Sequence, residues 1–323
     1  MKTIRCGVIG VGYLGRFHAQ KHSQLPHATL VGVSDLNPQT TDAVAQELGV
    51  TGYRDFRAML PHIDAVSIAA TTTAHYEIAK ACLQAGVHVL VEKPITETVV
   101  QANTLIALAH QQGLKLQVGH LERFNAARLA LEPFLHAPLF IESTRLAPFN
   151  PRGTDVNVIL DLMIHDIDLI QTMVNSPIVH MDAQGTPILS PSIDIANTRI
   201  HFQNHCIANV TASRISFKTE RKTRIFQRHS YLSIDYHQKQ FAVFSKGEGE
   251  MFPGIPNIIR HESALEQKDA LLEEIKAFLV CIEQNTKPLV TGEEGRDALG
   301  TAQMISDLIH HHQQTVQQSY DEC

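Results

Sequence analysis

The first 120 residues alternate short apolar runs with longer amphipathic stretches. The apolar runs predict strands at Ile4–Ile9, Thr29–Ser34, Ala65–Ala69, His88–Glu92 and Lys115–Gly119. Between them, segments with helical periodicity predict helices at Tyr13–Ser23, Pro38–Leu48, Ala74–Ala85 and Glu97–Gln112. Apolar strands that alternate with helices are typical of a parallel sheet, so this part of the chain is predicted to be a doubly wound α/β domain.

The pattern changes after Phe124. Apolar residues occupy every second position in Ala196–Phe202 and Leu232–Tyr236, which is typical of antiparallel strands with one solvated face. Helical periodicity predicts further helices at Val156–Val174, Ala264–Gln284 and Gly292–Gln314. We therefore expect two domains, residues 1–122 and residues 123–323, the second of the α+β class.

Composition and charge narrow the classes of partner. The 33 acidic and 27 basic residues are mixed along the chain, so the sequence has no basic patch typical of proteins that bind nucleic acid or an anionic membrane. The 5 cysteines are scattered without a C-x-x-C pair, which argues against a disulfide framework and a zinc site and fits a reducing cytosol. No signal-like segment or membrane-length apolar run is present. We expect a cytoplasmic protein that binds small molecules and no metal.

A glycine-rich turn, Gly10-Val11-Gly12-Tyr13-Leu14-Gly15, lies where the first strand ends and the first helix begins. In this position glycines permit a tight turn and let the backbone approach a pyrophosphate at the helix N-terminus. Asp35 follows about 20 residues later, where its carboxylate can accept both ribose hydroxyls of a dinucleotide and repel a 2′-phosphate. Because neither Leu36 nor Asn37 supplies an arginine, the sequence predicts NAD rather than NADP.

Glu92-Lys93-Pro94 ends the fourth predicted strand, at the sheet edge where ligands of open α/β folds bind. The ammonium group of Lys93 could hydrogen-bond a substrate hydroxyl and stabilise the alkoxide that forms as hydride leaves. The alternative is a solvated turn after a strand, with no chemical role.

Asp161 and His165 lie one helical turn apart in an otherwise apolar segment. The carboxylate could orient the imidazole and stabilise its protonated form, as a general base requires. A structural His–Asp hydrogen bond is an open alternative. A metal pair is a weaker one, because no third ligand has a convincing spacing.

These motifs, in this order, resemble the glucose–fructose oxidoreductase / inositol dehydrogenase (Gfo/Idh/MocA) family. Two further segments are similar to the family's domain crossover, 118–125, and to its C-terminal signature, 288–295. The resemblance implies a Rossmann domain, an α+β domain with a large open-faced antiparallel sheet, a cis peptide at Lys93–Pro94, and a homodimer or homotetramer formed through that sheet.

The resemblance also implies the site residues. Lys93, Asp161 and His165 would be catalytic, and the cofactor would contact Gly10, Gly12, Tyr13, Leu14, Gly15, Asp35, Ala70, Thr71, His75, Glu92, Lys93 and His120. The substrate would contact Lys93 and His165. Arg145 and Arg152, in the predicted loop before the catalytic helix, are candidates for a substrate diphosphate because a guanidinium fork matches phosphate oxygens.

Within the family, segments 157–168 and 122–125 most resemble the branch that oxidises C3 of UDP-N-acetylglucosamine on the way to the 3-amino sugar of lipid A. The resemblance therefore implies an NAD-dependent oxidoreductase acting on a secondary ring hydroxyl. Two alternatives stay open: another dehydrogenase of the family, acting on inositol, a free hexose or another sugar nucleotide, and a non-catalytic NAD-binding regulator.

Overall fold

The computed structural model describes residues 3–150, 156–264 and 268–321. The chain forms two compact units, each of which is described by itself. The first comprises Met1–Phe124 with Asp269–Leu299, and the second comprises Asn125–Lys268 with Gly300–Cys323. Among the described residues there is no helix with the length and apolar character needed to span a bilayer.

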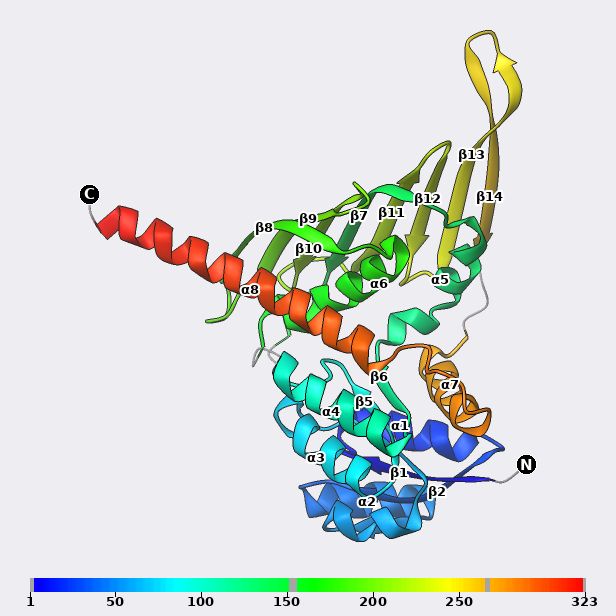
Figure 1. Ribbon diagram of the computed structural model, residues 1–323, viewed down its shortest axis with the longest axis vertical. Helices are drawn as coiled ribbons and strands as arrows, with labels where there is room; N and C mark the ends of the chain where they lie inside the picture. Colours follow the sequence, from blue (N-terminus) through cyan, green and yellow to red (C-terminus); the bar gives the residue numbers. More distant parts are fainter. Residues whose placement is uncertain (1–2, 151–155, 265–267, 322–323) are drawn as a thin grey trace. The chain divides into compact units, whose positions relative to one another are not determined.

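The first unit is built on a six-stranded parallel sheet in the order β3-β2-β1-β4-β5-β6 (Figure 1). The strand order reverses between β1 and β4, and ligands of open α/β sheets bind at the carboxyl ends of the strands at such a point. The strands are β1 (Ile4–Ile9), β2 (Ala28–Ser34), β3 (Thr51–Tyr53), β4 (Ala65–Ile68), β5 (His88–Glu92) and β6 (Leu116–Gly119). The longer helices of this unit are α1 (Tyr13–Gln24), α2 (Pro38–Leu48), α3 (Thr72–Gln84), α4 (Val99–Gln112) and α7 (Ala270–Glu283).

The predicted α/β architecture of this unit is confirmed. All five predicted strands are present, because buried parallel strands appear in the sequence as apolar runs. Strand β3 was not predicted: it has three residues, one of them Gly52, and so leaves no apolar run to recognise. Capping side chains fix two of the helix starts, since Asn37 accepts from Gln39 N–H at α2 and Thr98 forms a capping box with Gln101 at α4.

Helix α7 corrects the predicted helix Ala264–Gln284. Ala264 is instead the last residue of strand β14 (Ile255–Ala264). The helix begins at Ala270 because the Asp269 carboxylate accepts hydrogen bonds from the N–H groups of Leu271 and Leu272.

The same helix also changes the predicted domain division. Residues Ile275 and Phe278 of α7 are fully buried and pack in one core cluster with Cys6 and Leu90 of the parallel sheet. The segment Asp269–Leu299 therefore belongs to the first unit, although the sequence pattern had placed everything after residue 122 in the second.

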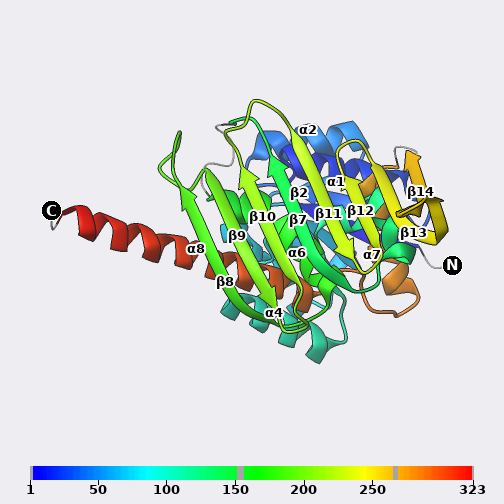
Figure 2. The ribbon, with the colours of Figure 1, turned by 90° about the horizontal axis from the view of Figure 1, so that it is seen from above.

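The second unit contains an eight-stranded sheet in the order β14-β13-β12-β11-β7-β10-β9-β8 (Figure 2). All neighbours are antiparallel except β7 and β10, so the predicted antiparallel sheet is confirmed with one parallel pair. The strands are β7 (Pro138–Leu146), β8 (Ile178–Thr186), β9 (Ile195–Phe202), β10 (Ile207–Ser213), β11 (Glu220–Gln227), β12 (Ser230–Asp235), β13 (Gln240–Phe252) and β14. The helices are α5 (Ala126–Leu131), α6 (Ile164–Val174) and the later part of α8 (Gly292–Asp321).

One face of this sheet is buried and the other is open. Strand β9 shows the alternation clearly, because Ala196, Ile200 and Phe202 are buried and Asn197 and Arg199 are exposed. Helix α6 packs against β7 and β10 on the buried face, and Figure 2 looks onto the other face. Strands β13 and β14 extend past the remaining strands as a long hairpin (Figure 1).

The predicted helix Val156–Val174 differs from the structure at its start. Residues Ile159–Met163 form a π-helical turn, in which the N–H of Ile164 donates to the carbonyl of Ile159, and regular α6 follows from Ile164. Asp161 lies in this turn and His165 lies in the first turn of α6. Single π-turns of this kind occur frequently at functional sites.

Candidate functional site

The glycine-rich turn between β1 and α1 has the geometry of a phosphate loop. Gly10 has φ +81°, and a Cβ there would lie 2.6 Å from the backbone N of Ala70. A Cβ at Gly15 would lie 1.7 Å from the carbonyl O of Gly10, so only glycine lets α1 approach the turn. A Cβ at Gly12 would meet nothing within 4 Å, which leaves room for a ligand at the helix N-terminus.

Asp35 is fixed at the carboxyl end of β2 beside this turn. Its Oδ2 accepts the N–H of Val11 at 2.8 Å, and its Oδ1 accepts the N–H of Asn37 at 2.9 Å. A carboxylate held in this way presents its remaining lone pairs to ribose hydroxyls without having to reorganise.

A cavity of about 670 Å³ opens between the carboxyl ends of β1, β2 and β4. Five of the predicted cofactor contacts line it: Gly10, Gly12, Asp35, Ala70 and Thr71. Tyr13 and Leu14 lie next to it, in the first turn of α1, and their side chains are exposed. The residues present therefore fit a dinucleotide: a glycine turn for the pyrophosphate and a carboxylate for the ribose.

Lys93 follows the last residue of β5, and the peptide bond between Lys93 and Pro94 is cis, as the resemblance implied. His75 lies behind this segment: its Nδ1 is 2.9 Å from the carbonyl O of Pro94 and its Nε2 is 3.0 Å from that of Ala70. Burial lowers the pKa of His75. With 1% of its surface exposed, His75 positions the Lys93–Pro94 segment and Ala70 rather than presenting its ring to a ligand.

Glu92 points to the sheet face that α1 and α7 cover. Its Oε1 lies 2.9 Å from Nε2 of His18, whose side chain is fully buried. A second histidine of α1, His22, contacts the hydroxyl of Ser67 at 2.8 Å, and burial followed by the charge of His18 lowers its pKa to about 3. These polar residues beneath the sheet were not predicted, because a histidine on an amphipathic helix gives no sign of which strand it will face.

Glu274 of α7 is an unusual member of the same face. It is completely buried, and neither carboxylate oxygen has a hydrogen-bond partner among the described residues. Burial, and then the charge of Glu92, raise its pKa well above the ordinary value. The native state therefore binds a proton at pH values where an unfolded chain, with a glutamate pKa of about 4.3, has lost it.

The variant Glu274→Gln is therefore expected to gain stability over the wild type as pH rises. The raised pKa of Glu274 stabilises the native state only while the carboxyl is protonated in both states, that is, below about pH 4.3. Above that pH the wild type loses this stability progressively, whereas a glutamine side chain does not titrate. The expected difference in the free energy of unfolding is roughly 1–3 kcal/mol, which is the cost of a buried unpaired polar group. Urea unfolding at about pH 5 and about pH 8 measures the difference. Glu283→Gln, an exposed change on the same helix, is the control, and equal pH dependence of the two variants would contradict the prediction.

His120, the last predicted cofactor contact, follows β6 and is almost fully buried. Its backbone N–H donates to the carbonyl of Val118, and the N–H of Arg123 donates to the carbonyl of His120. His120 is therefore part of the turn that directly follows β6.

In the second unit, Asp161 and His165 are half-buried, and hydrogen bonds fix the start of the segment that carries them. Asn157 caps the π-turn, since its Oδ1 accepts the N–H of Leu160, and its Nδ2 donates to the hydroxyl of Ser306 on α8. The N–H of Val158 donates to the carbonyl of Ile193.

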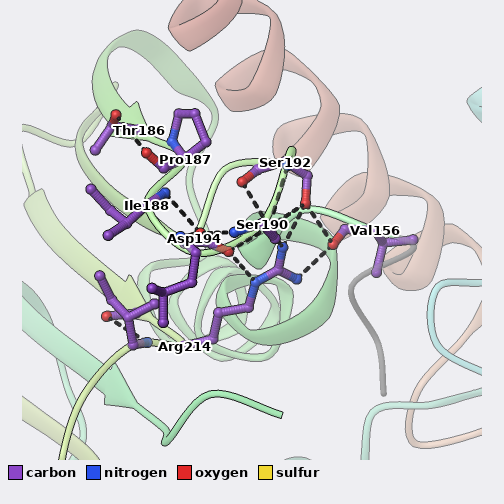
Figure 3. A network of polar contacts seen from close by, with 11 residues as sticks. Val156, Thr186, Pro187, Ile188, Ser190, Ser192, Asp194 and Arg214 are labelled. Atoms are coloured by element: carbon purple, nitrogen blue, oxygen red, sulfur yellow. Dashed lines mark hydrogen bonds and ion pairs between the residues drawn. The ribbon is translucent and has the colours of Figure 1, made fainter. Parts of the chain in front are cut away.

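A buried ion pair between Asp194 and Arg214 holds Val156, the residue that precedes Asn157 (Figure 3). Arg214 donates to Asp194 at 2.8 Å and, through Nη1, to the carbonyl of Val156 at 2.7 Å. Asp194 also accepts three backbone N–H groups, from Ile188, Leu189 and Ser190. Burial by itself raises the pKa of the Asp194 carboxyl, but hydrogen bonds from Ser190, Arg214 and the backbone lower it below its ordinary value.

The structure places Arg145 differently from the prediction. Instead of lying in a loop it belongs to β7, where it is 2% exposed and its Nε donates to Asp166 at 2.7 Å. Asp166 also accepts from Ser143. Because a buried guanidinium and carboxylate compensate each other's charge, this placement argues against a role for Arg145 in holding a substrate diphosphate. Arg152, the other candidate, lies outside the described residues.

The predicted site residues thus fall into two groups. The structure brings the glycine turn, Asp35, Ala70 and Thr71 together at one cavity, and Lys93 directly follows β5 of the same sheet. Asp161 and His165 belong to the second unit.

Comparison with known proteins decides the family. A family model described as an oxidoreductase family with an NAD-binding Rossmann fold matches residues 4–120, and the model of the GFO/IDH/MocA C-terminal domain matches residues 142–231. The chain belongs to the Gfo/Idh/MocA family of oxidoreductases. The resemblance stated from the motifs is confirmed, and with it the NAD-binding domain.

Two members of the Gfo/Idh/MocA family that resemble this protein show the range of substrates in the family. UDP-N-acetylglucosamine 3-dehydrogenase of Acidithiobacillus ferrooxidans is 38% identical over 94% of this chain and 97% of its own. A solved structure of that enzyme has a TM-score of 0.89, with 35% identity over 96% of this chain and 98% of the other. A structure of scyllo-inositol dehydrogenase from Lactobacillus casei, with NAD(H) and scyllo-inositol bound, has a TM-score of 0.81 with 26% identity, covering 96% of this chain and 98% of the other.

Proposed function

We propose that this protein oxidises the C3 hydroxyl of UDP-N-acetylglucosamine to a ketone, with hydride transferred to NAD. The observation that carries the proposal is the 38% identity to a UDP-N-acetylglucosamine 3-dehydrogenase along almost the full length of both chains. The glycine turn, Asp35 and the cavity beside them support the cofactor half of the reaction.

In this mechanism NAD, when bound, accepts the hydride from the sugar carbon. His165 takes the hydroxyl proton, so that the C–H electron pair leaves as hydride while the O–H bond breaks. Its Nδ1 is buried, so we assign Nε2 as the proton acceptor. Lys93 hydrogen-bonds the same oxygen and stabilises its developing charge, and Asp161 positions the imidazole.

Further parts of the proposal concern the surroundings of the reaction. We place the protein in the cytoplasm, in the route that supplies a 3-amino sugar for lipid A, and expect a homodimer or homotetramer formed through the open face of the second sheet. That face is large and has no helix of its own unit among the described residues packed on it (Figure 2).

A substrate panel tests the function. The purified protein is incubated with NAD and, separately, with UDP-N-acetylglucosamine, UDP-glucose, glucose and myo-inositol, and reduced cofactor is followed by absorbance. Reduction with UDP-N-acetylglucosamine at a kcat/KM at least ~10-fold above that of any other compound is expected, since a site that hydrogen-bonds a substrate group discriminates against compounds that lack it. Preference for myo-inositol would replace the proposal by the polyol alternative, and no reduction with any compound would favour the regulator.

A further inference from the structure

The cofactor cavity contains two arginines that the sequence did not place there. Beside Asp35 and Leu36 it is lined by Arg54, which follows β3, and by Arg57 in the short helix at Phe56–Ala58. The sequence pattern offered no arginine near Asp35, because only the pairing of β3 with β2 brings residue 54 to this edge of the sheet.

Arg54 follows β3, but its guanidinium group reaches the start of α2, at the end of the loop that follows β2. Its Nη1 donates to the carbonyl of Pro38 at 2.8 Å, and its Nη2 contacts Asp42 at 2.8 Å. In Rossmann domains that bind NADP, an arginine near the end of the second strand accommodates the 2′-phosphate of the adenosine ribose. The guanidinium group of Arg54 therefore occupies the region where a 2′-phosphate would be held.

Arg57 provides a second guanidinium in the same cavity. It lies over the ring of Phe56, 4.8 Å from the centroid, and its Nη1 is 3.5 Å from Asp55. The side chains of Arg54 and Arg57 are 57% and 64% exposed. Exposed ion pairs such as theirs with Asp42 and Asp55 are weak, so a phosphate dianion can replace those carboxylates as a partner.

Asp35 is the group that opposes such a ligand. Both of its oxygens are tied to backbone N–H groups, so the carboxylate cannot swing away from an incoming phosphate. A phosphate placed on the loop after β2 would gain two guanidinium partners. Of the three carboxylates that line the cavity, Asp55 is paired with Arg57, Glu77 belongs to α3, and Asp35 is the one held at the end of β2.

We propose that Arg54 and Arg57 form an anion subsite for the 2′-phosphate of NADP, and that the negative charge of the Asp35 carboxylate prevents the phosphate from binding there. The protein then uses NAD, although its cofactor cavity already contains the two arginines that would bind the 2′-phosphate of NADP. The inference concerns the cofactor cleft and does not depend on which sugar is oxidised.

Calorimetric titration of the full-length protein with NAD⁺ and with NADP⁺ tests the subsite without any turnover. Asp35→Asn and, as an independent change, Asp35→Ser are expected to raise the affinity for NADP⁺ by ~10-fold or more. Each removes the repulsion between the carboxylate and the 2′-phosphate. The affinity for NAD⁺ should fall, because a ribose contact is lost.

Arginine variants in the Asp35→Asn background then identify the phosphate partners. Arg54→Gln and Arg57→Gln should each lower the affinity for NADP⁺ by ~10-fold, the worth of a charge-assisted hydrogen bond, and should lower the affinity for NAD⁺ by a smaller factor, because NAD⁺ has no 2′-phosphate. Arg5→Gln is the matched control: Arg5 is also an exposed arginine paired with a carboxylate, Asp64, but it lies at the amino end of β1.

Two results would overturn the proposal. One is no gain of NADP⁺ affinity in either Asp35 variant, with native-like thermal unfolding of both. The other is an NADP⁺ affinity that responds to Arg5→Gln as much as to Arg54→Gln and Arg57→Gln. Failure of the sugar panel would leave these binding results unaffected, so the two proposals are tested separately.

Discussion

Replacing His165 by alanine is expected to lower turnover by about 10²–10⁴, which is the usual contribution of a general base. The affinity for NAD should stay within about 2-fold of the wild type, because the phosphate loop and Asp35 lie on a separate folding unit from α6. Turnover is measured with the sugar that the panel selects, and NAD binding by calorimetry.

His180→Ala is the matched control for this variant. His180 also belongs to the second unit, but it lies on β8 with its side chain 62% exposed and contacts Asp182. It should leave turnover unchanged. Turnover of His165→Ala equal to that of the control would remove the imidazole from the mechanism.

The second large effect concerns folding rather than chemistry. Asp194→Asn is expected to lower the free energy of unfolding by about 3–5 kcal/mol, because it leaves the buried guanidinium of Arg214 without its charge partner. The loss is increased because asparagine has a single oxygen, whereas the carboxylate uses one oxygen for three backbone N–H groups and the other for Ser190 and Arg214. Thermal unfolding followed by circular dichroism measures it.

Asp182→Asn provides the comparison, since it breaks an exposed pair of the same unit, between His180 and Asp182. A change within about 1 kcal/mol is expected there. If Asp194→Asn were no more destabilising than Asp182→Asn, the Asp194–Arg214 pair would not be a support of the segment that begins at Val156.

The sequence predicted the parts of the fold that local patterns determine. Strand β1 has the predicted ends, and the glycine turn after it has the predicted backbone geometry, because a positive φ at Gly10 and contact distances at Gly15 exclude other residues. The cavity beside Asp35 follows from the same motif. For these features one segment of the chain and its helix or strand period carry the whole signal.

The features that were missed depend on partners distant in the sequence. Arg145 was expected to be in a loop, yet Asp166 holds it inside the sheet domain. The π-turn before α6 depends on a shift of one backbone hydrogen bond, which no side-chain period reports. Arg54 enters the cofactor cavity only because β3 pairs with β2.

The path of the chain through the first unit has a consequence for biosynthesis. Every strand of the parallel sheet leaves the ribosome before residue 120, but the helix that covers Cys6 and Leu90 follows about 150 residues later. During synthesis the nascent cofactor domain therefore exposes an apolar face, a state in which chaperones bind and aggregation competes with folding. A chain cut short before Asp269 would keep that face uncovered permanently, however complete its nucleotide-binding motif.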